Sequence, residues 1–413
     1  MNAFFFRIVL PGIFFLAIFS LKAQYVTKIQ FEPDSERHQN QLKPFKAIAF
    51  SLDTAVTPQT WLKTANKTFA ILPDEHSRVE NGVQMSKLIV FDQAENEFII
   101  LGKSVNQVQT AYLIHTPDLE ESFSFSLQNV DSCAHPPMVM QEVWRAGLPD
   151  PDYERIPNIV RHQIIHHSAT DNELTDYVNL IRSIYLYHTE VNGWSDIGYN
   201  YLISPDGILF AGRDPGETLD QDGVLGAHFC ASNSGTMGIC MLGTFMNQMP
   251  TSEALSTLNQ LISWKAITSN LDPEGTFSHP LNPSLGTIAG HRDGCATSCP
   301  GDSLASILPQ IRTHSLETLY GCGVFPGLST LNNSSELKIF PNPSNSSTIN
   351  YSSSLNFQKA TLFDLLGNQH AIWHNIAKEN SLQLPSNLKE GLYIIQFITK
   401  SGMVIPMKIL VSE

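Results

Sequence analysis

Charged side chains are scarce in this sequence. Asp, Glu, Lys and Arg make up 15% of its 413 residues, and 25 Lys and Arg stand against 39 Asp and Glu, which gives a net charge of −14. No block of Lys and Arg stands out. An acidic chain without a basic stripe lacks the electrostatic footprint for nucleic acid or an anionic lipid surface. We therefore expect no nucleic-acid partner, whereas a polymeric carbohydrate remains open as a substrate.

Long apolar runs are also lacking, except near the N-terminus. Arg7 precedes the apolar run 8–19, and Leu21-Lys22-Ala23-Gln24 offers a small-residue cleavage site. The run is shorter than the roughly 20 residues of a membrane span. Residues 1–24 therefore predict a signal peptide, with an uncleaved anchor as the alternative. We expect a secreted or cell-surface protein without a stable membrane span.

The chain divides into three regions by composition. Residues 25–131 hold short β-type runs separated by polar or Gly-containing turns, which predicts a β-sandwich-like accessory domain. The runs are 47–50, 87–91, 98–101 and 111–114. After a linker at 323–336, residues 337–413 again alternate short strands with turns, which predicts a small all-β module.

The middle region, 133–322, changes to alternating strands and helices, which predicts an α/β domain with helices packed on a mixed sheet. Strands are expected at 163–165, 199–203, 208–211, 237–242 and 287–289. Helices are expected at 174–188, at 252–267 with Ser252 as the N-cap, and at 302–319. Pro205-Asp206-Gly207 is typical of a hairpin turn between two of the strands.

Two histidines and one cysteine of this region follow strands or precede a helix. His166 ends one predicted strand, His291 follows another, and Cys299 comes eight residues later. Two imidazoles and a thiolate, with a fourth position left for water, are how catalytic zinc is held. Such a metal lowers the pKa of water to roughly 7 and polarises a carbonyl, as hydrolysis of an amide requires. The alternatives are ordinary buried imidazoles and a disulfide-bonded Cys299.

Residues of about 144–320 resemble the peptidoglycan recognition protein and phage-type amidase family. The matching stretches are IIHHSAT (164–170), GWSDIGYNYLI (193–203), AGRD (211–214), GAH (226–228), NSGTMGICMLG (233–243) and GHRDGCATSCPGD (290–302). They occur in the family's order and cover nearly the whole segment. The resemblance implies hydrolysis of the amide bond between N-acetylmuramic acid and L-alanine in peptidoglycan.

The same resemblance implies zinc ligands at His166, His291 and Cys299, with His166 preferred over His167. It implies that Tyr199 contacts the zinc-bound water and the developing oxyanion, a role that suits a neutral hydrogen-bond donor. Thr297 falls where phage members carry a catalytic Lys and many cellular members carry Thr, so the resemblance makes Thr297 the second candidate catalytic residue beside Tyr199. We therefore expect no help from a cation at that position.

Substrate contacts are implied at Arg213, His228 and Asn233, which lie in family-matching loops. Trp194 offers an aromatic face for a sugar, or is a buried core residue. Two alternative functions are a surface protein that binds peptidoglycan without cutting it, and a thiol hydrolase with Cys299 as nucleophile. Members that only bind usually lack the cysteine ligand, so Cys299 favours an enzyme.

All six cysteines lie in the middle region, and an exported context favours disulfides. With Cys299 as a ligand, five remain. Cys240, in a predicted buried strand, is the candidate for a free core thiol. The other four allow three pairings. Our preferred pairing joins Cys133 to Cys322 at the ends of the domain and Cys230 to Cys295 beside the metal.

Residues 337–413 resemble the C-terminal sorting domain of type IX secretion substrates. The matching stretches are LKIFPNPS (337–344), LFDLLGNQ (362–369) and the closing segment 388–411. An immunoglobulin-like binding module is the alternative. The resemblance implies export by the type IX secretion machinery, so foreign or shed peptidoglycan is the expected target.

Overall fold

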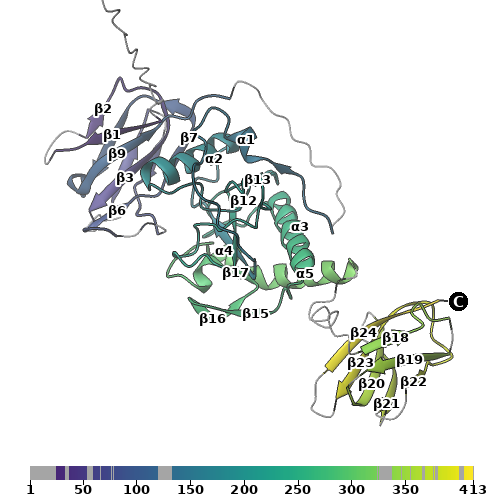
Figure 1. The fold of residues 1–413 in the computed structure, drawn as a ribbon. Coiled ribbons are helices and arrows are strands. Elements are labelled where there is room, and N and C mark those ends of the chain that lie inside the picture. The colour runs from purple at the N-terminus through teal and green to yellow at the C-terminus, as the bar shows by residue number, and fades with distance from the viewer. Residues whose placement is uncertain are drawn as a thin grey trace, which may run out of the picture. The chain divides into compact units, whose positions relative to one another are not determined.

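Figure 1 shows the computed structural model of the chain. It describes residues 25–412, apart from 33–36, 54–58, 66, 76, 78, 120–132, 323, 325–336, 346, 354, 365–367, 375, 377–379 and 400–403. The predicted signal peptide, most of the predicted linker and the centre of the LFDLLGNQ stretch lie outside these residues. Within the described part, no helix is both long enough and apolar enough to cross a membrane.

Contacts divide the chain into two compact units. The first joins the N-terminal part up to Asp118 with Asn179–Gly193, and the second comprises Leu119–Val178 and Trp194–Glu413. The segment Asn179–Gly193 lies within the sequence range that we assigned to the central domain. The domain boundaries themselves stay predictions.

The first unit is built from two sheets. One has the order β1-β9-β3-β6 with β7 also paired to β3, and the other has the order β2-β8-β4-β5. The strands are β1 (Val26–Gln30), β2 (His38–Gln39), β3 (Phe45–Asp53), β4 (Thr60–Lys63), β5 (Thr68–Ala70), β6 (Val83–Met85), β7 (Ile89–Glu95), β8 (Phe98–Gly102) and β9 (Val108–Ile114), with a short 3-10 helix at Val105–Gln107. Both sheets contribute to one apolar cluster, in which Phe45 of β3 meets Phe98 of β8 edge to face, with 6.2 Å between ring centroids.

A helix of the sequence's middle region completes this unit. Helix α2 (Tyr177–Leu186) begins three residues later than predicted and runs on into a π-helical turn at Tyr187–Val191. The Asn179 amide donates to the Phe91 carbonyl at 3.2 Å, Arg182 to the Pro117 carbonyl at 2.8 Å, and the Tyr187 hydroxyl to the Ser86 carbonyl at 3.1 Å. These three buried polar side chains therefore hydrogen-bond to strands and loops of the first unit.

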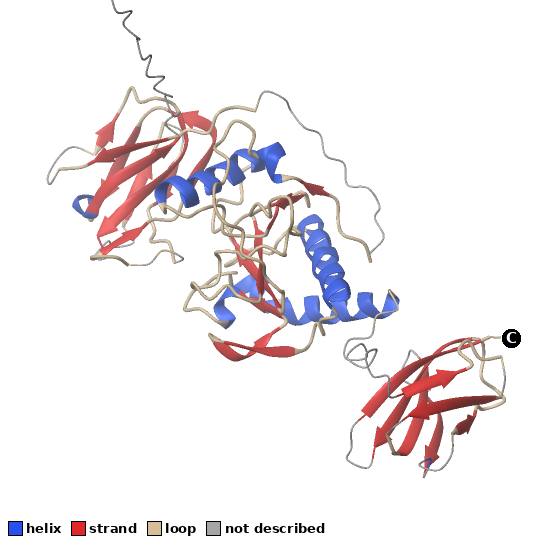
Figure 2. Cartoon of the chain, in the orientation of Figure 1, coloured by secondary structure: helices blue, strands red, loops and turns tan. Residues whose placement is uncertain are grey.

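The central domain of the second unit is a six-stranded mixed sheet with helices on one face (Figure 2). Its order is β10-β13-β12-β14-β11-β17, in which only the β12–β13 hairpin is antiparallel. The strands are β10 (Met138–Val139), β11 (His162–His167), β12 (Tyr201–Ile203), β13 (Leu209–Ala211), β14 (Thr236–Met241) and β17 (Ile288–Gly290), with a separate hairpin of β15 (Thr276–His279) and β16 (Asn282–Gly286). The helices are α1 (Gln141–Trp144), α3 (Ser252–Ser269), a 3-10 turn at His291–Asp293, α4 (Asp302–Ser306) and α5 (Leu308–Gly321).

The alternation of side chains along β14 explains how this sheet has one face for the core and one for a site. Met237, Ile239 and Met241 pack with Leu258 and Leu261 of α3 and with other apolar residues of the main cluster. The intervening positions, Thr236, Gly238 and Cys240, are small. Because successive side chains of a strand point to opposite faces, these small residues lie on the face away from that cluster.

The predicted mixed α/β domain is confirmed, with two corrections to its helices and two elements that were not predicted. Thr251, not Ser252, caps α3, because its hydroxyl accepts from the Ala254 N–H at 3.2 Å. The helix predicted at 302–319 is two helices, because Pro309, in the first turn of α5, has no N–H to continue the ladder from α4. The hairpin β15–β16 and the short α1 were not predicted.

The C-terminal residues form two sheets, with the orders β18-β19-β22 and β21-β20-β23-β24. The strands are β18 (Leu337–Phe340), β19 (Thr348–Ser353), β20 (Phe357–Asp364), β21 (Gln369–His374), β22 (Ser381–Gln383), β23 (Gly391–Thr399) and β24 (Val404–Val411). Tyr351, Phe357 and Phe397 meet in their shared core, with ring centroids 5.0–6.1 Å apart. The predicted all-β module is confirmed.

Candidate metal centre

The two candidate histidine ligands come together because their strands are parallel neighbours. Strand β11 pairs with β17 so that Ile165 lies opposite Gly290, and the next residues along each chain are His166 and His291. The carboxyl ends of parallel strands meet at one edge of a sheet, where ligand sites of α/β folds lie. The rings of His166 and His291 are 4.5 Å apart between centroids.

The pleat of β11 separates His166 from His167. Ile165 belongs to the apolar cluster of α3 and α5, and the ring of His167 lies on the same side, where its Nδ1 accepts from the Phe245 N–H at 3.4 Å. The ring of His166 points to the opposite face, toward Cys299. Of the two adjacent histidines, His166 is therefore the one beside the other candidate ligands.

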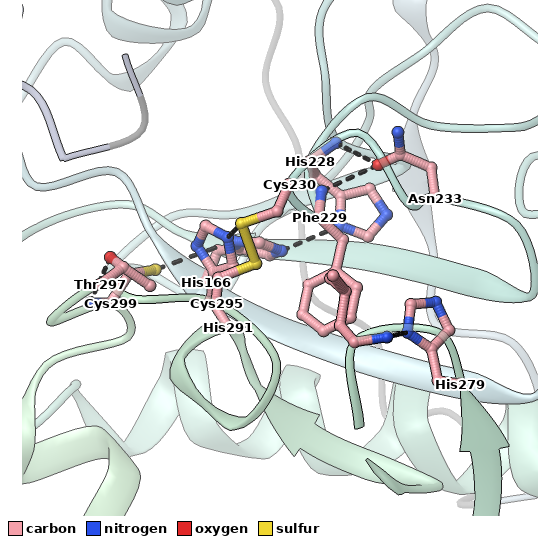
Figure 3. Close-up of a disulfide and its surroundings, with 11 residues drawn as sticks. His166, His228, Phe229, Cys230, Asn233, His279, His291, Cys295, Thr297 and Cys299 are labelled. Atoms are coloured by element: carbon pink, nitrogen blue, oxygen red, sulfur yellow. Dashed lines mark hydrogen bonds between the residues drawn. A yellow bond between two sulfur atoms is a disulfide. The ribbon is translucent and has the colours of Figure 1, made fainter. Parts of the chain in front are cut away.

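The three candidate donors match the donor set of a zinc site. One ligand atom from each of His166, His291 and Cys299 lies within 4.8 Å of the others, and all three residues are at most 3% exposed (Figure 3). The Sγ of Cys299 is 3.7 Å from Nδ1 of His166. Tetrahedral zinc with bonds of about 2.05 Å to nitrogen and 2.3 Å to sulfur separates such donors by about 3.6 Å. The residues therefore fit zinc.

Two hydrogen bonds hold Cys299 in place, one to its sulfur and one from its backbone N–H. The His167 N–H donates to its Sγ at 3.4 Å, and its own N–H donates to the Thr297 hydroxyl at 3.1 Å. Thr297 itself is half-buried.

Tyr199 and Cys240 border the donors. The Tyr199 ring centroid lies 5.2 Å from that of His166, and the side chain is 8% exposed. Burial raises the pKa of the Cys240 thiol well above its ordinary value and the nearby Cys299 sulfur raises it further, while a hydrogen bond with Tyr199 opposes them. Cys240 therefore stays a neutral thiol beneath the site, as predicted for a free core cysteine.

His228 makes a direct contact with a candidate ligand. Its Nδ1 lies 3.0 Å from Nε2 of His166 (Figure 3). Its Nε2 lies 3.2 Å from the Thr236 hydroxyl. Burial, together with the positive charge of Arg213, lowers the pKa of His228 to about 3. The ring is therefore neutral at physiological pH.

Both preferred disulfides are present. Cys133 and Cys322 are joined, with 5.9 Å between their Cα atoms, and Cys230 and Cys295 are joined beside the metal candidates, with Cys230 Sγ 3.8 Å from His291 Nε2. Cys230, His291 and Cys295 also lie within 4.8 Å of one another. Because Cys230 and Cys295 are joined in a disulfide, neither sulfur is available as a thiolate ligand for a metal.

The remaining predicted site residues make contacts within the protein. Asn233 accepts from the N–H groups of His228 and Phe229, both at 2.8 Å, and so fixes the loop that carries His228. Arg213 is 6% exposed and donates to the Ser195 hydroxyl at 2.7 Å, and its guanidinium lies 5.0 Å from the Tyr153 ring centre. Trp194 is half-buried. That these residues contact substrate stays a prediction.

Sequence reasoning missed the contacts of Thr236, Gly238 and Cys240 on the site face of β14. A signal for them exists in TMGICM, where small residues alternate with large apolar ones. Such alternation predicts that one face of a buried strand packs a core while the other leaves room for side chains from elsewhere. On this strand, the room is filled by the ring of His228.

Comparison with known proteins assigns two segments. Residues 156–302 match the family model described as N-acetylmuramoyl-L-alanine amidase, and residues 338–412 match that of a secretion system C-terminal sorting domain. Peptidoglycan-recognition protein SC2 of Drosophila melanogaster is 31% identical over 162 residues, which cover 39% of this chain and 77% of that protein. The N-acetylmuramoyl-L-alanine amidase of Homo sapiens is 31% identical over 128 residues, which cover 31% of this chain and 19% of that protein. The solved structure of Drosophila PGRP-LB is 26% identical with a TM-score of 0.33, covering 41% of this chain and 91% of that one.

Proposed function

Because this chain belongs to the family of peptidoglycan recognition proteins and N-acetylmuramoyl-L-alanine amidases, we propose that it is a zinc-dependent amidase of peptidoglycan. The bond cut is the amide between N-acetylmuramic acid and L-alanine. The observation that carries the proposal is the buried set of donors from His166, His291 and Cys299. A protein that only binds peptidoglycan has no need for a buried cysteine sulfur placed 3.7 Å from an imidazole nitrogen.

The chain's own residues supply binding and charge stabilisation. His166, His291 and Cys299 would hold the metal. When bound, zinc supplies Lewis-acid polarisation of the scissile carbonyl and lowers the pKa of a water. The Tyr199 hydroxyl, beside His166, donates a hydrogen bond to the carbonyl oxygen as negative charge grows there. Because position 297 is Thr rather than Lys, no side-chain cation assists from that position.

The flanking segments support an exported enzyme. The sorting-domain match at 338–412 indicates delivery by a secretion system. We propose that residues 1–24 direct passage across the inner membrane and that the type IX machinery reads 337–413. An amidase delivered beyond the outer membrane meets foreign or shed peptidoglycan rather than its own cell wall.

The test is release of peptides from purified sacculi, read by mass spectrometry of the products. Zinc-loaded wild-type protein should produce free glycan strands and stem peptides that begin with L-alanine. Cys299→Ala should bind sacculi with no release, because it removes one ligand from the buried set. Peptide release by Cys299→Ala at the wild-type rate would overturn the zinc assignment.

The same assay separates the two alternative functions. Binding without release by the zinc-loaded wild-type protein would favour a recognition protein, as several relatives are named. A thiol hydrolase would resist a chelator and lose activity with a thiol reagent. We expect this protein, by contrast, to lose activity when a chelator removes zinc and to recover it when zinc is restored.

A further inference from the structure

The Thr236 hydroxyl is the fixed end of a chain of hydrogen bonds that leads to the metal candidates. Its oxygen lies 2.7 Å from the Asn233 carbonyl oxygen and 3.2 Å from Nε2 of His228. A carbonyl only accepts, so the single hydroxyl proton is donated to Asn233. The Thr236 oxygen must then accept from His228, whose Nε2 therefore carries the proton.

The next link passes this constraint to His166. A neutral imidazole with its proton on Nε2 has a lone pair on Nδ1. That Nδ1 lies 3.0 Å from Nε2 of His166, so His166 must donate and its Nε2 carries the proton. In neutral His166 the remaining nitrogen, Nδ1, has the lone pair. It is this atom that lies 3.7 Å from the Cys299 sulfur.

The protein is shaped to hold the His228 ring in this position. A Cβ on Gly238 would stand 2.6 Å from Cγ and Cδ2 of the ring, and a Cβ on Gly226 would stand 2.7 Å from Cδ2. The His228 ring therefore has space only because positions 226 and 238 are both glycine. The ring is 8% exposed, and Thr236 and His166 are fully buried, so water does not compete for these hydrogen bonds.

We propose that Thr236 and His228 are positioning residues that fix His166 as its Nε2–H tautomer, with the Nδ1 lone pair aimed at the metal. The inference rests on the proposed zinc site and assigns His228 a role inside the protein. A ligand imidazole is commonly oriented by the partner of its other nitrogen, and loss of such a partner costs about 10- to 100-fold in metal affinity. Here the partner is a second histidine, oriented in turn by a threonine.

The tautomer is measured directly in the zinc-free, full-length protein. Long-range ¹H–¹⁵N correlation spectra of ¹⁵N-histidine-labelled protein distinguish Nδ1–H from Nε2–H rings, and the signals are assigned with His166→Gln and His228→Gln. We expect both His166 and His228 to be Nε2–H tautomers at pH 7.5. An Nδ1–H signal for His166 would overturn the proposal, whether or not any variant folds.

Thr236→Val and Thr236→Ser form the matched pair. Valine keeps the shape but not the hydroxyl, so the tautomers of His228 and His166 should mix and zinc affinity should fall about 10- to 100-fold. Serine keeps the hydroxyl and should retain one tautomer and an affinity within about threefold of wild type, as expected when the hydrogen bond is kept. Unchanged tautomers and affinity in Thr236→Val would refute the positioning role.

Failure of the proposed function gives a different result. If the wild-type protein neither binds zinc nor releases peptides, the amidase assignment fails while the tautomers of the zinc-free protein still decide the orientation of His166. If zinc binding and release are normal but His166 is the Nδ1–H tautomer before binding, the positioning inference alone fails.

Discussion

Substitution of Gly238 by alanine should damage the metal site without touching a candidate ligand. The new Cβ would stand 2.6 Å from Cγ and Cδ2 and 2.9 Å from Nδ1 of His228, whereas ordinary van der Waals contact begins near 3.4 Å. The ring or the strand must therefore shift by about 0.8 Å. Strand β14 is fixed between β11 and β12, so the ring is the part that moves.

The displaced ring loses a short hydrogen bond. The distance from His166 Nε2 to His228 Nδ1 is 3.0 Å. A shift of about 0.8 Å would lengthen it beyond about 3.5 Å, where the contact is no longer a hydrogen bond. Overpacking of a buried site costs about 1–3 kcal/mol of stability. Loss of the partner of a ligand imidazole costs about 10- to 100-fold in zinc affinity. Both effects should appear together in Gly238→Ala.

Zinc affinity is measured by competition with a chromogenic chelator, and stability by thermal unfolding of the zinc-free protein. Gly321→Ala is the control: its Cβ meets no atom within 4 Å, and it lies in the last turn of α5. It should be neutral or stabilise by up to about 1 kcal/mol through helix propensity. If Gly238→Ala matched the wild type in both measurements, the packing of His228 against β14 would be wrong.

Three further predictions concern the site and the cysteines. Tyr199→Phe should lower kcat for peptide release by about 10²- to 10³-fold and leave zinc affinity unchanged. Product mass spectrometry measures the first and chelator competition the second, and an equal loss of kcat and zinc affinity would point to a structural role. Protein unfolded without reductant should show two reactive thiols, from Cys240 and Cys299, and six after reduction; four thiols before reduction would exclude one disulfide. Loop-closure entropy gives about 5 kcal/mol for the 189-residue loop of Cys133–Cys322 and about 4 kcal/mol for the 65-residue loop of Cys230–Cys295, so paired Ala substitutions should lower Tm more for the first pair. An equal or reversed order would contradict the entropic account.

The sequence was most informative where a local pattern determines a local structure. The buried runs around 163–165 and 237–242 became β11 and β14, in which every residue is buried. The proximity of His166, His291 and Cys299 was predictable from family motifs. Their spacing along the chain does not reveal it, since 133 residues separate His166 from Cys299.

The parts that sequence reasoning missed depend on tertiary contacts. The segment Asn179–Gly193 has the helical pattern of a core element, but the pattern does not say which core it joins. Pro309 marks a break between α4 and α5 that an apolar periodicity over 302–319 conceals. The role of His228 depends on a threonine eight residues later in the chain and on the absence of a Cβ at Gly238, which only the folded strand brings together.

The disulfide between Cys133 and Cys322 has a mechanical consequence. Its Cα atoms are 5.9 Å apart, and they enclose every candidate ligand of the metal centre. A pull on the chain before residue 133 and after residue 322 passes through the two sulfurs rather than along the chain between them, a sequence separation of 189. Tension that arises while either end of the chain is held therefore bypasses β11, β17 and the loop that carries Cys299.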